Sequence, residues 1–420
     1  MIRKILSFAL AAAALNALAV PAALDPKPQA PNEKYAKSYM DRHSWFLEHK
    51  AEAGEGAVVF IGDSITEAFA ASPAYKRTFV NPETRKYKGF NLGYDGDRTE
   101  NVIWRIENGE LDGYKAKTVV LLIGTNNLAN DYPVEDVMAG IDRIITLIRE
   151  KQPQAKLIVS ALLPRAGKDS ELRQKAEKWN IEIERTALKR GVQCVNFWNR
   201  FLDADGNLLP KTFGDGLHPT AAGYEIWTEA LLPLLEKGND EFTIFGLEDV
   251  AEKKDDTVFT IRDAGEKIEF SFTVRDPTVC VVTDKKVEFD LAYADRVEVY
   301  FCPTALQEKG YVCAEIDSMG HPLDYHVTDE HKFLWDWNFK TLKCDGKPAE
   351  GYSGYAVTGS IAKSELAEYG IDTTAFWLGV FRADCPEARK PAEWYSAMPM
   401  APRPDFHRKG MVFPLSLRKE

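Results

Sequence analysis

In the stretch VVFIGDSIT, residues 58–66, an apolar run ends abruptly in Gly62-Asp63-Ser64. Continuous apolar residues are typical of a strand that is covered on both faces of a parallel sheet. Glycine after such a strand permits a tight turn that other residues resist. The pattern therefore predicts a buried strand over 57–61 that brings the Ser64 hydroxyl to the rim of a sheet.

The segments that follow alternate between apolar strands and amphipathic helices as far as residue 236. Further strands are expected at 118–123, 156–163 and 192–197, and helices at 34–50, 133–148, 169–190 and 219–235. Pro219 is expected to be the first residue of the last helix, a position that suits proline. This order implies an α/β fold, a parallel sheet with helices on both faces.

A polar linker at 237–241 separates this region from one in which apolar and polar residues alternate with a period of two. Clear cases are 268–274, 297–301 and 355–359. Many short strands with turn residues between them predict an antiparallel β-sandwich over 242–420. A chain of 420 residues is also long enough for two domains. We therefore expect a first domain at 55–236, preceded by an N-terminal tail and helix at 24–54.

The N-terminus has the pattern of a signal peptide. Arg3 and Lys4 precede the apolar run 5–20, and small residues follow. This pattern predicts a cleaved leader at 1–23 and a secreted or periplasmic protein without stable membrane insertion. An uncleaved anchor is the alternative, but the run is short for a spanning helix and ends at Pro21. The net charge of -11 argues against nucleic acid as a partner.

The six cysteines offer one candidate disulfide. Cys302 and Cys313 flank a possible hairpin turn, and secretion would permit a bond between them. The remaining cysteines are expected to be inert thiols. No Cys or His spacing matches a zinc site, so no metal is expected.

A second polar stretch, Asp215-Gly216-Leu217-His218-Pro219, supplies a base and an acid. After His43 and His49, His218 is the only histidine before residue 236, and Asp215 stands three residues ahead of it, where it can orient the imidazole. Together with Ser64 these residues have the logic of an activated serine nucleophile. Hydrolysis of an acyl ester, which needs no cofactor, is the leading interpretation.

Two further segments offer donors for an oxyanion. The loop at 91–98 contains Gly93, and Asn126 follows the strand predicted to end at residue 123. Both lie where ligands bind in open α/β sheets, beyond the carboxyl ends of strands. Asp97 and Arg98 either shape the pocket or form a structural ion pair, and they stay outside the predicted site.

These four blocks resemble the SGNH (GDSL-like) hydrolase family over about residues 55–236. The family's marks fall on Ser64, Gly93, Asn126, and Asp215 with His218, while 96–105 and 109–113 are similar to the branch of the platelet-activating-factor acetylhydrolase catalytic subunits. The resemblance implies a flavodoxin-like three-layer fold with Ser64 as nucleophile. It also implies an oxyanion hole made of the Ser64 and Gly93 N–H groups and the Asn126 amide.

The second region resembles family 9 carbohydrate-binding modules. The residues that carry this resemblance are 295–301, 354–357, 361–366, 378–382 and 394–396. Sugar-binding members of that family clamp a sugar between tryptophans, and here Phe333, Trp335 and Trp337 alternate as if they shared one face of a strand. Trp335 and Trp337 are the candidate sugar contacts, with a place in the sandwich core as the alternative. Trp377 and Trp394 are expected in the core.

The sequence as a whole predicts an exported serine esterase that acts on an acetylated polysaccharide or oligosaccharide. A lipid or lysophospholipid esterase is the first alternative, although no long apolar insertion is present to form an acyl groove. A non-catalytic glycan-binding protein is the second. The glycan, the acyl group and the oligomeric state stay open.

Overall fold

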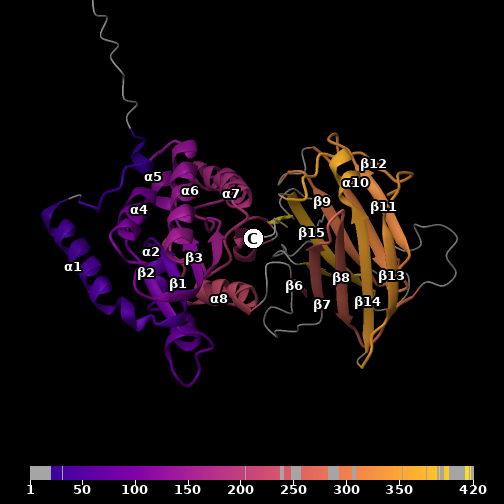
Figure 1. Cartoon of the computed structure of the whole chain (residues 1–420), viewed down its shortest axis with the longest axis horizontal. Coiled ribbons are helices and arrows are strands. Elements are labelled where there is room, and N and C mark those ends of the chain that lie inside the picture. Colours follow the sequence, from indigo (N-terminus) through magenta and orange to yellow (C-terminus); the bar gives the residue numbers. More distant parts are fainter. Residues whose placement is uncertain are drawn as a thin grey trace, which may run out of the picture.

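The computed structural model of the chain describes residues 20–30, 32–203, 205–236, 241–246, 257–281, 293–304, 309–351, 353–374, 376–385, 387, 392–396, 412–415 and 417. They form two regions, each built around its own sheet (Figure 1). Most of the predicted leader at 1–23 and of the linker at 237–241 lies outside the described residues. Within these ranges, none of the helices combines the length and the hydropathy that a membrane span requires.

The first sheet is parallel and has five strands in the order β2-β1-β3-β4-β5. The strands are β1 (Glu55–Gly62), β2 (Gly89–Gly93), β3 (Lys115–Leu122), β4 (Lys156–Ser160) and β5 (Gln193–Val195). β1 lies between β2 and β3, with Ile61 in register with Leu92 and Leu121. Six consecutive buried residues at the end of β1 explain its apolar run, because neighbouring strands and helices surround it.

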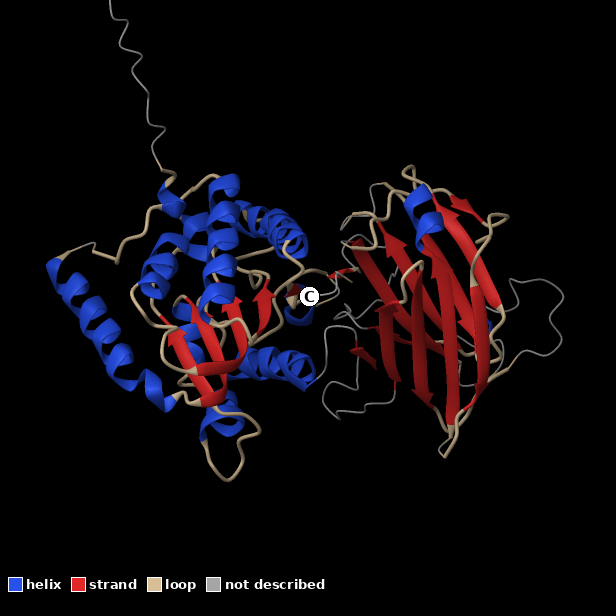
Figure 2. Cartoon of the chain, in the orientation of Figure 1, coloured by secondary structure: helices blue, strands red, loops and turns tan. Residues whose placement is uncertain are grey.

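Helices cover both faces of this sheet, so the predicted fold class is confirmed (Figure 2). α4, α6 and α7 lie side by side, whereas α3 packs on α8. Phe60 of β1 packs on the second group, because its ring lies 5.7 Å from that of Tyr75 in α3. The helical segments are η1 (Ala22–Leu24), α1 (Glu33–His49), η2 (Lys50–Glu52), α2 (Ser64–Phe69), α3 (Pro73–Tyr75), η3 (Lys76–Val80), α4 (Thr99–Glu107), α5 (Thr125–Ala129), α6 (Val134–Lys151), α7 (Glu171–Lys189), η4 (Trp198–Phe201) and α8 (Ala221–Glu236).

The start of the last helix differs from the prediction. α8 begins at Ala221, and Pro219 lies ahead of it in a bridge to Phe213. Thr220 stands at the boundary, where its carbonyl accepts the N–H of Tyr224 at 2.9 Å. Because Pro219 pairs with Phe213 in an extended conformation, it stays outside the helix. The same bridge holds the loop that carries His218 in place.

The segment before α1 packs onto the first region as an N-terminal arm, residues 20–30. Ala23 is fully buried, and its carbonyl accepts the hydroxyl of Thr99 at 2.9 Å. A Cβ on Gly140 of α6 would lie 2.8 Å from the same carbonyl, so glycine allows this close approach. The arm therefore lies against α4 and α6.

The second region is an antiparallel sheet that folds back on itself (Figure 1). Its strand order is β12-β11-β10-β9-β15-β16-β6-β7-β8-β14-β13, with β17 paired to β15. Apolar residues from both halves, among them Phe272 and Val299, form one core between them. The elements are β6 (Glu241–Gly246), β7 (Thr257–Asp263), β8 (Lys267–Arg275), β9 (Arg296–Cys302), β10 (Tyr311–Asp317), β11 (Pro322–Val327), β12 (Phe333–Leu334), β13 (Lys343–Pro348), β14 (Gly354–Ala362), α10 (Lys363–Glu368), β15 (Phe376–Asp384), β16 (Glu393–Ser396) and β17 (Phe413–Leu415).

The candidate disulfide is wrong. Cys302 ends β9 and Cys313 lies in β10, but the register pairs Cys313 with Tyr300. The two cysteines therefore stand diagonally, a separation too large for the geometry of a disulfide. All six cysteines are thiols, and these two pack in a buried aromatic cluster.

The expected strand carrying Phe333, Trp335 and Trp337 on one face is also wrong. β12 pairs with β11 over only two residues and ends at Leu334, after which the chain turns. Trp335 stacks on Phe333 with ring centroids 5.2 Å apart, whereas Trp337 donates its indole N–H to the Tyr369 hydroxyl at 2.7 Å. The two tryptophans therefore belong to different clusters.

Candidate active site

Ser64 is placed by the junction of β1 and α2. β1 ends at Gly62, and Asp63 caps α2 by accepting the N–H of Ile65 at 3.0 Å. A Cβ on Gly62 would lie 2.4 Å from the carbonyl oxygen of Leu122, so only glycine fits between β1 and β3 here. Ser64 is the first residue of α2 and lies at the carboxyl end of the sheet.

The predicted serine, base and acid meet at this edge. The Ser64 Oγ lies 2.9 Å from Nε2 of His218, and Nδ1 of His218 lies 2.7 Å from Oδ2 of Asp215. Oδ1 of Asp215 accepts the backbone N–H of His218 at 2.7 Å. This backbone bond, followed by the bond from the imidazole, holds the pKa of Asp215 well below its usual range.

An ionised Asp215 determines the role of each ring nitrogen. It accepts the Nδ1–H of His218, so Nε2 is left as the acceptor for the hydroxyl of Ser64. A neighbouring contact holds the loop, because Ala166 N–H donates to the carbonyl of Gly216 at 2.7 Å. The arrangement can take a proton from a serine hydroxyl, which is the requirement for an attack on an ester.

Ser64 and Asn126, two of the predicted oxyanion donors, lie at the same edge of the sheet. The Ser64 N–H stands in the first turn of α2, where no carbonyl of the helix can accept it. Asn126 in α5 donates one amide N–H to the carbonyl of Asp97 at 3.0 Å, and its carboxamide carries a second. Both residues follow neighbouring strands of the parallel sheet, β1 and β3.

The N–H of Gly93, the third predicted oxyanion donor, already has an acceptor within the chain. Its N–H donates to Oδ1 of Asn91 at 2.9 Å, and the Asn91 amide in turn donates to the carbonyl of Thr66 at 2.7 Å. A Cβ at Gly93 would lie 2.1 Å from the backbone nitrogen of Glu67. In this structure the glycine therefore allows β2 to pack on α2, and its N–H becomes available to a ligand only when Asn91 releases it.

Comparison with known proteins places this site in a family. Residues 60–226 match the model of the GDSL-like Lipase/Acylhydrolase family. Subunit alpha2 of platelet-activating factor acetylhydrolase IB from Rattus norvegicus and from Homo sapiens is 34% identical over 209 residues, 48% of this chain and 87% of the relative. The chain belongs to the GDSL-like lipase/acylhydrolase family.

Other GDSL-like relatives cover the same part of the chain. Subunit alpha1 of the acetylhydrolase from Bos taurus is 35% identical over 200 residues, 47% of this chain and 82% of the relative. The crystal structure of a GDSL-like lipase from Bacteroides thetaiotaomicron VPI-5482 is 23% identical and covers 46% of this chain and 97% of its own, with a TM-score of 0.39. These relatives match only the first region, so the resemblance of the second region to family 9 carbohydrate-binding modules stays a prediction from the sequence.

A buried polar network lies beneath the GDSL-like site. Asp97, fully buried, bonds through Oδ2 to Nε of Arg105 at 2.8 Å and through Oδ1 to Nε2 of Gln29 at 2.6 Å. Burial raises the pKa of Asp97 to about 6, against the lowering effect of the Arg105 guanidinium. The ion pair considered for Asp97 is thus made with Arg105, while Arg98 pairs with Glu100 at 2.7 Å.

Gln29 and Arg165 carried no recognisable signal in the sequence. Gln29 lies outside every family block, and Arg165 follows β4. The Arg165 side chain donates to the hydroxyl and the carbonyl of Thr125 at 2.7 and 3.0 Å, next to Asn126. Contacts of this kind join segments that are far apart in the chain, so no local pattern announces them.

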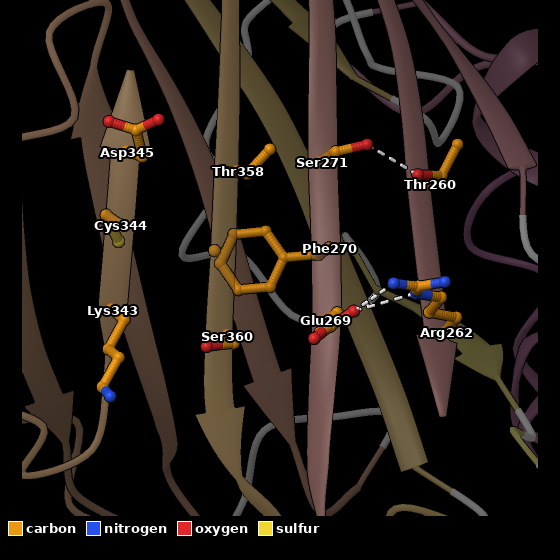
Figure 3. Close-up of a pocket in the computed structure, with 11 residues that line it drawn as sticks. Thr260, Arg262, Glu269, Phe270, Ser271, Lys343, Cys344, Asp345, Thr358 and Ser360 are labelled. Carbon is orange, nitrogen blue, oxygen red and sulfur yellow. Dashed lines mark hydrogen bonds and ion pairs between the residues drawn. The ribbon is translucent and has the colours of Figure 1, made fainter. Parts of the chain in front are cut away.

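The second region contains a polar groove of about 570 Å³ on the face of the sheet turned away from its core (Figure 3). Two cross-strand rows line it across β7, β8, β14 and β13. The first row is Thr260, Ser271, Thr358 and Asp345, and the second is Arg262, Glu269, Ser360 and Lys343. The two rows together hold four hydroxyl side chains, two carboxylates and two cations, so the lining is rich in hydroxyls and balanced in charge.

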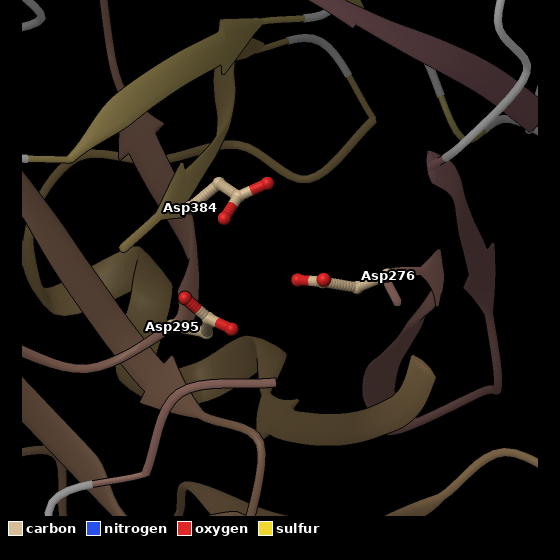
Figure 4. A group of neighbouring side chains, drawn as sticks. All are labelled: Asp276, Asp295 and Asp384. Carbon is tan, nitrogen blue, oxygen red and sulfur yellow. The ribbon is translucent and has the colours of Figure 1, made fainter. Parts of the chain in front are cut away.

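Three carboxylates also gather in the second region (Figure 4). Asp276 and Asp384 each accept from Nη2 of Arg382 at 2.8 Å. Asp295 accepts the backbone N–H groups of Cys280 and Cys385 at 2.7 and 2.6 Å. Donors of the chain thus hold all three side chains in place, as in a structural ion-pair cluster that joins the ends of β8 and β15.

Proposed function

We propose that the chain is an exported serine esterase that removes small acyl groups, acetyl in the first place, from a carbohydrate. The unbroken hydrogen-bond chain from Ser64 through His218 to Asp215 carries the esterase part of this proposal. Family membership supports it, because GDSL-like proteins are named as lipases and acylhydrolases. The export part rests on the apolar N-terminal sequence alone.

The mechanism follows from the roles of the ring nitrogens. Ser64 Oγ attacks the ester carbon while Nε2 of His218 takes the hydroxyl proton, and Asp215 stabilises the imidazolium that forms. When the tetrahedral intermediate collapses, the bond from carbon to the alcohol oxygen breaks and His218 returns the proton to that oxygen. A water molecule, deprotonated by His218 in turn, then attacks the acyl-serine. The bond from the acyl carbon to Oγ breaks, His218 returns the proton to Oγ, and the carboxylic acid leaves.

The negative oxygen of the intermediate needs donors that are already oriented. We assign this role to the Ser64 N–H and to the second N–H of Asn126, and to the Gly93 N–H once Asn91 releases it. Removing one such donor from an enzyme costs about 10²–10³ in kcat. Asn126→Ala is therefore expected to lower kcat by roughly that factor.

Two observations favour an acetylated carbohydrate as substrate. The relatives are named acetylhydrolases, which points to a small acyl group. The groove of the second region offers hydroxyl and charged side chains in rows, the kind of surface that hydrogen-bonds to neutral, hydroxyl-rich chains. A lipid esterase is the second candidate, because the relatives' names include platelet-activating factor.

Activity on a series of substrates tests the proposal. We would measure kcat and KM on para-nitrophenyl esters of increasing chain length, on acetylated xylan and on platelet-activating factor. Ser64→Ala should abolish hydrolysis, whereas Ser44→Ala, an exposed serine of α1, should leave it unchanged. A Ser64→Ala protein that keeps its activity would refute the mechanism, and a preference for long acyl chains would move the assignment to lipids.

The part played by the groove has its own test. Asp345→Ala and Lys343→Ala are expected to weaken binding to the polysaccharide and to leave hydrolysis of para-nitrophenyl acetate unchanged. Lys347→Ala is a matched control on the same strand, because it lies outside the groove lining. If all three variants bind the polysaccharide as well as the wild type does, the groove does not hold the substrate.

A further inference from the structure

The N-terminal arm reaches the loop that follows β2. Nε2 of Gln29 donates to the carbonyl of Asp95 at 3.0 Å and to the carboxylate of Asp97 at 2.6 Å. Further along the arm, the carbonyl of Lys27 accepts the amide of Asn101 in α4 at 2.9 Å. The arm lies outside residues 60–226, which match the family, and outside the domain that the sequence predicts at 55–236.

α1 holds the same loop from the other side. The hydroxyl of Tyr35 donates to the Asp95 carbonyl at 2.6 Å, and Nη2 of Arg42 donates to the carbonyl of Gly93 at 2.7 Å. The loop 93–97 is therefore bound by three side chains that all precede β1. Gln29 alone among them bonds to a residue that contacts Asn126.

Asp97 transmits this restraint to Asn126. Its carboxylate is bonded by Gln29 on one oxygen and by Arg105 on the other, and its carbonyl accepts an N–H of Asn126 at 3.0 Å. A carboxamide is planar, so when one N–H is fixed the direction of the other is fixed as well. The second N–H of Asn126 is the one that the proposed mechanism directs at the oxyanion.

We propose that Gln29 is a positioning residue of the esterase: it holds Asp97 in place and thereby aims the Asn126 donor at the oxyanion. The inference rests on the proposed function and adds a residue from outside the family blocks to it. Without Gln29, one oxygen of a fully buried carboxylate loses its donor, and the loop shifts to find another. Small displacements of a donor have large effects on rate, so a fall in kcat of about tenfold is expected.

A double-mutant cycle tests this coupling. Gln29→Met keeps the length of the side chain and removes both hydrogen bonds, and it is measured alone and together with Asn126→Ala on para-nitrophenyl acetate. If Gln29 acts through Asn126, Gln29→Met lowers kcat about tenfold at unchanged KM in the wild type and lowers it no further in Asn126→Ala. Fold changes that multiply in the double variant would overturn the proposal.

Gln154→Met is the matched control. Gln154 also donates to a backbone carbonyl, that of Ala116 at 3.1 Å, but at the amino end of β3, away from Asn126. Its kcat should equal that of the wild type. If Gln29→Met does not fold, Gln29→Asn, which keeps the amide but shortens its reach, replaces it in the same cycle with the same expected result.

The outcome for Ser64→Ala separates the two proposals. Activity that survives Ser64→Ala refutes the esterase mechanism itself. Activity that vanishes in Ser64→Ala, combined with independent effects at Gln29 and Asn126, leaves the mechanism standing and refutes only the positioning role.

Discussion

Asp63 precedes Ser64 and is buried, with only one carboxylate oxygen bonded in the described structure: Oδ1 accepts the N–H of Ile65 at 3.0 Å, while Oδ2 has no partner. Burial raises the pKa of this group to about 7. A raised folded-state pKa means that the native protein holds the proton more tightly than the unfolded chain does. The native state therefore loses stability as the pH rises from about 4 to about 7.

Asp63→Asn should remove this pH dependence, because Asn keeps an oxygen for Ile65 but does not ionise. The melting temperature of the variant is expected to rise relative to that of the wild type between pH 4 and pH 8. Each unit of pKa shift corresponds to about 1.4 kcal/mol. Asp205→Asn, at an exposed position, is the control. A difference in melting temperature that is the same at every pH would contradict the assignment.

Asp215 is expected to act through His218. In Asp215→Asn the ring nitrogen Nδ1 loses its anionic acceptor, so the neutral tautomer with a free Nε2 is no longer favoured. A decrease in kcat of about 10³–10⁴ is expected by analogy with other serine triads. The control is Asp203→Asn, because Asp203 likewise accepts backbone N–H groups but lies away from Ser64. A decrease of less than about tenfold would remove Asp215 from the catalytic set.

At the scale of elements, the packing of β2 on α2 depends on Gly93. A Cβ there would lie 2.1 Å from the nitrogen of Glu67, and this atom belongs to helix backbone that cannot turn aside. Gly93→Ala is expected to lower the free energy of unfolding by about 3 kcal/mol or more, because both elements must separate. Urea titration measures the change. Gly167→Ala, which has open space around it, should be neutral, and equal stability of the two variants would contradict this account.

At the scale of the whole molecule, α7 joins the two regions. Trp377 of β15 donates its indole N–H to Glu184 at 3.4 Å, and Leu188 packs in one cluster with Trp377 and Val412. Burial raises the pKa of Glu184 to about 7. As for Asp63, a raised pKa means that the folded protein favours the protonated carboxyl. The contact between the regions is therefore strongest at low pH and weakens as the pH rises through 7.

Trp377→Ala should uncouple the two regions. Truncating a buried tryptophan costs about 3–5 kcal/mol, and here the loss falls on the contact between the regions. In calorimetry the single transition expected of the wild type should split into two. Trp45→Ala, which removes an exposed tryptophan of α1, should leave one transition. A single, uniformly lowered transition in Trp377→Ala would mean that the regions do not unfold separately.

Several features were determined by local sequence alone. The apolar run at β1 and the alternation of strands and helices predicted the parallel sheet, because periodicity follows directly from the geometry of each element. The spacing from Asp215 to His218 predicted a contact that the structure contains, because two residues three positions apart in a turn lie close together. The catalytic roles of these residues remain predictions.

Other features were decided only by the tertiary structure. The register of β9 and β10 separated Cys302 from Cys313, and the turn after Leu334 separated Trp335 from Trp337. Folding also brought Gln29 to Asp97, and Glu184 to Trp377. These contacts join segments 68 and 193 residues apart. Local pattern is set by near neighbours in the chain, whereas such pairings depend on how whole elements pack, and the sequence does not display that packing.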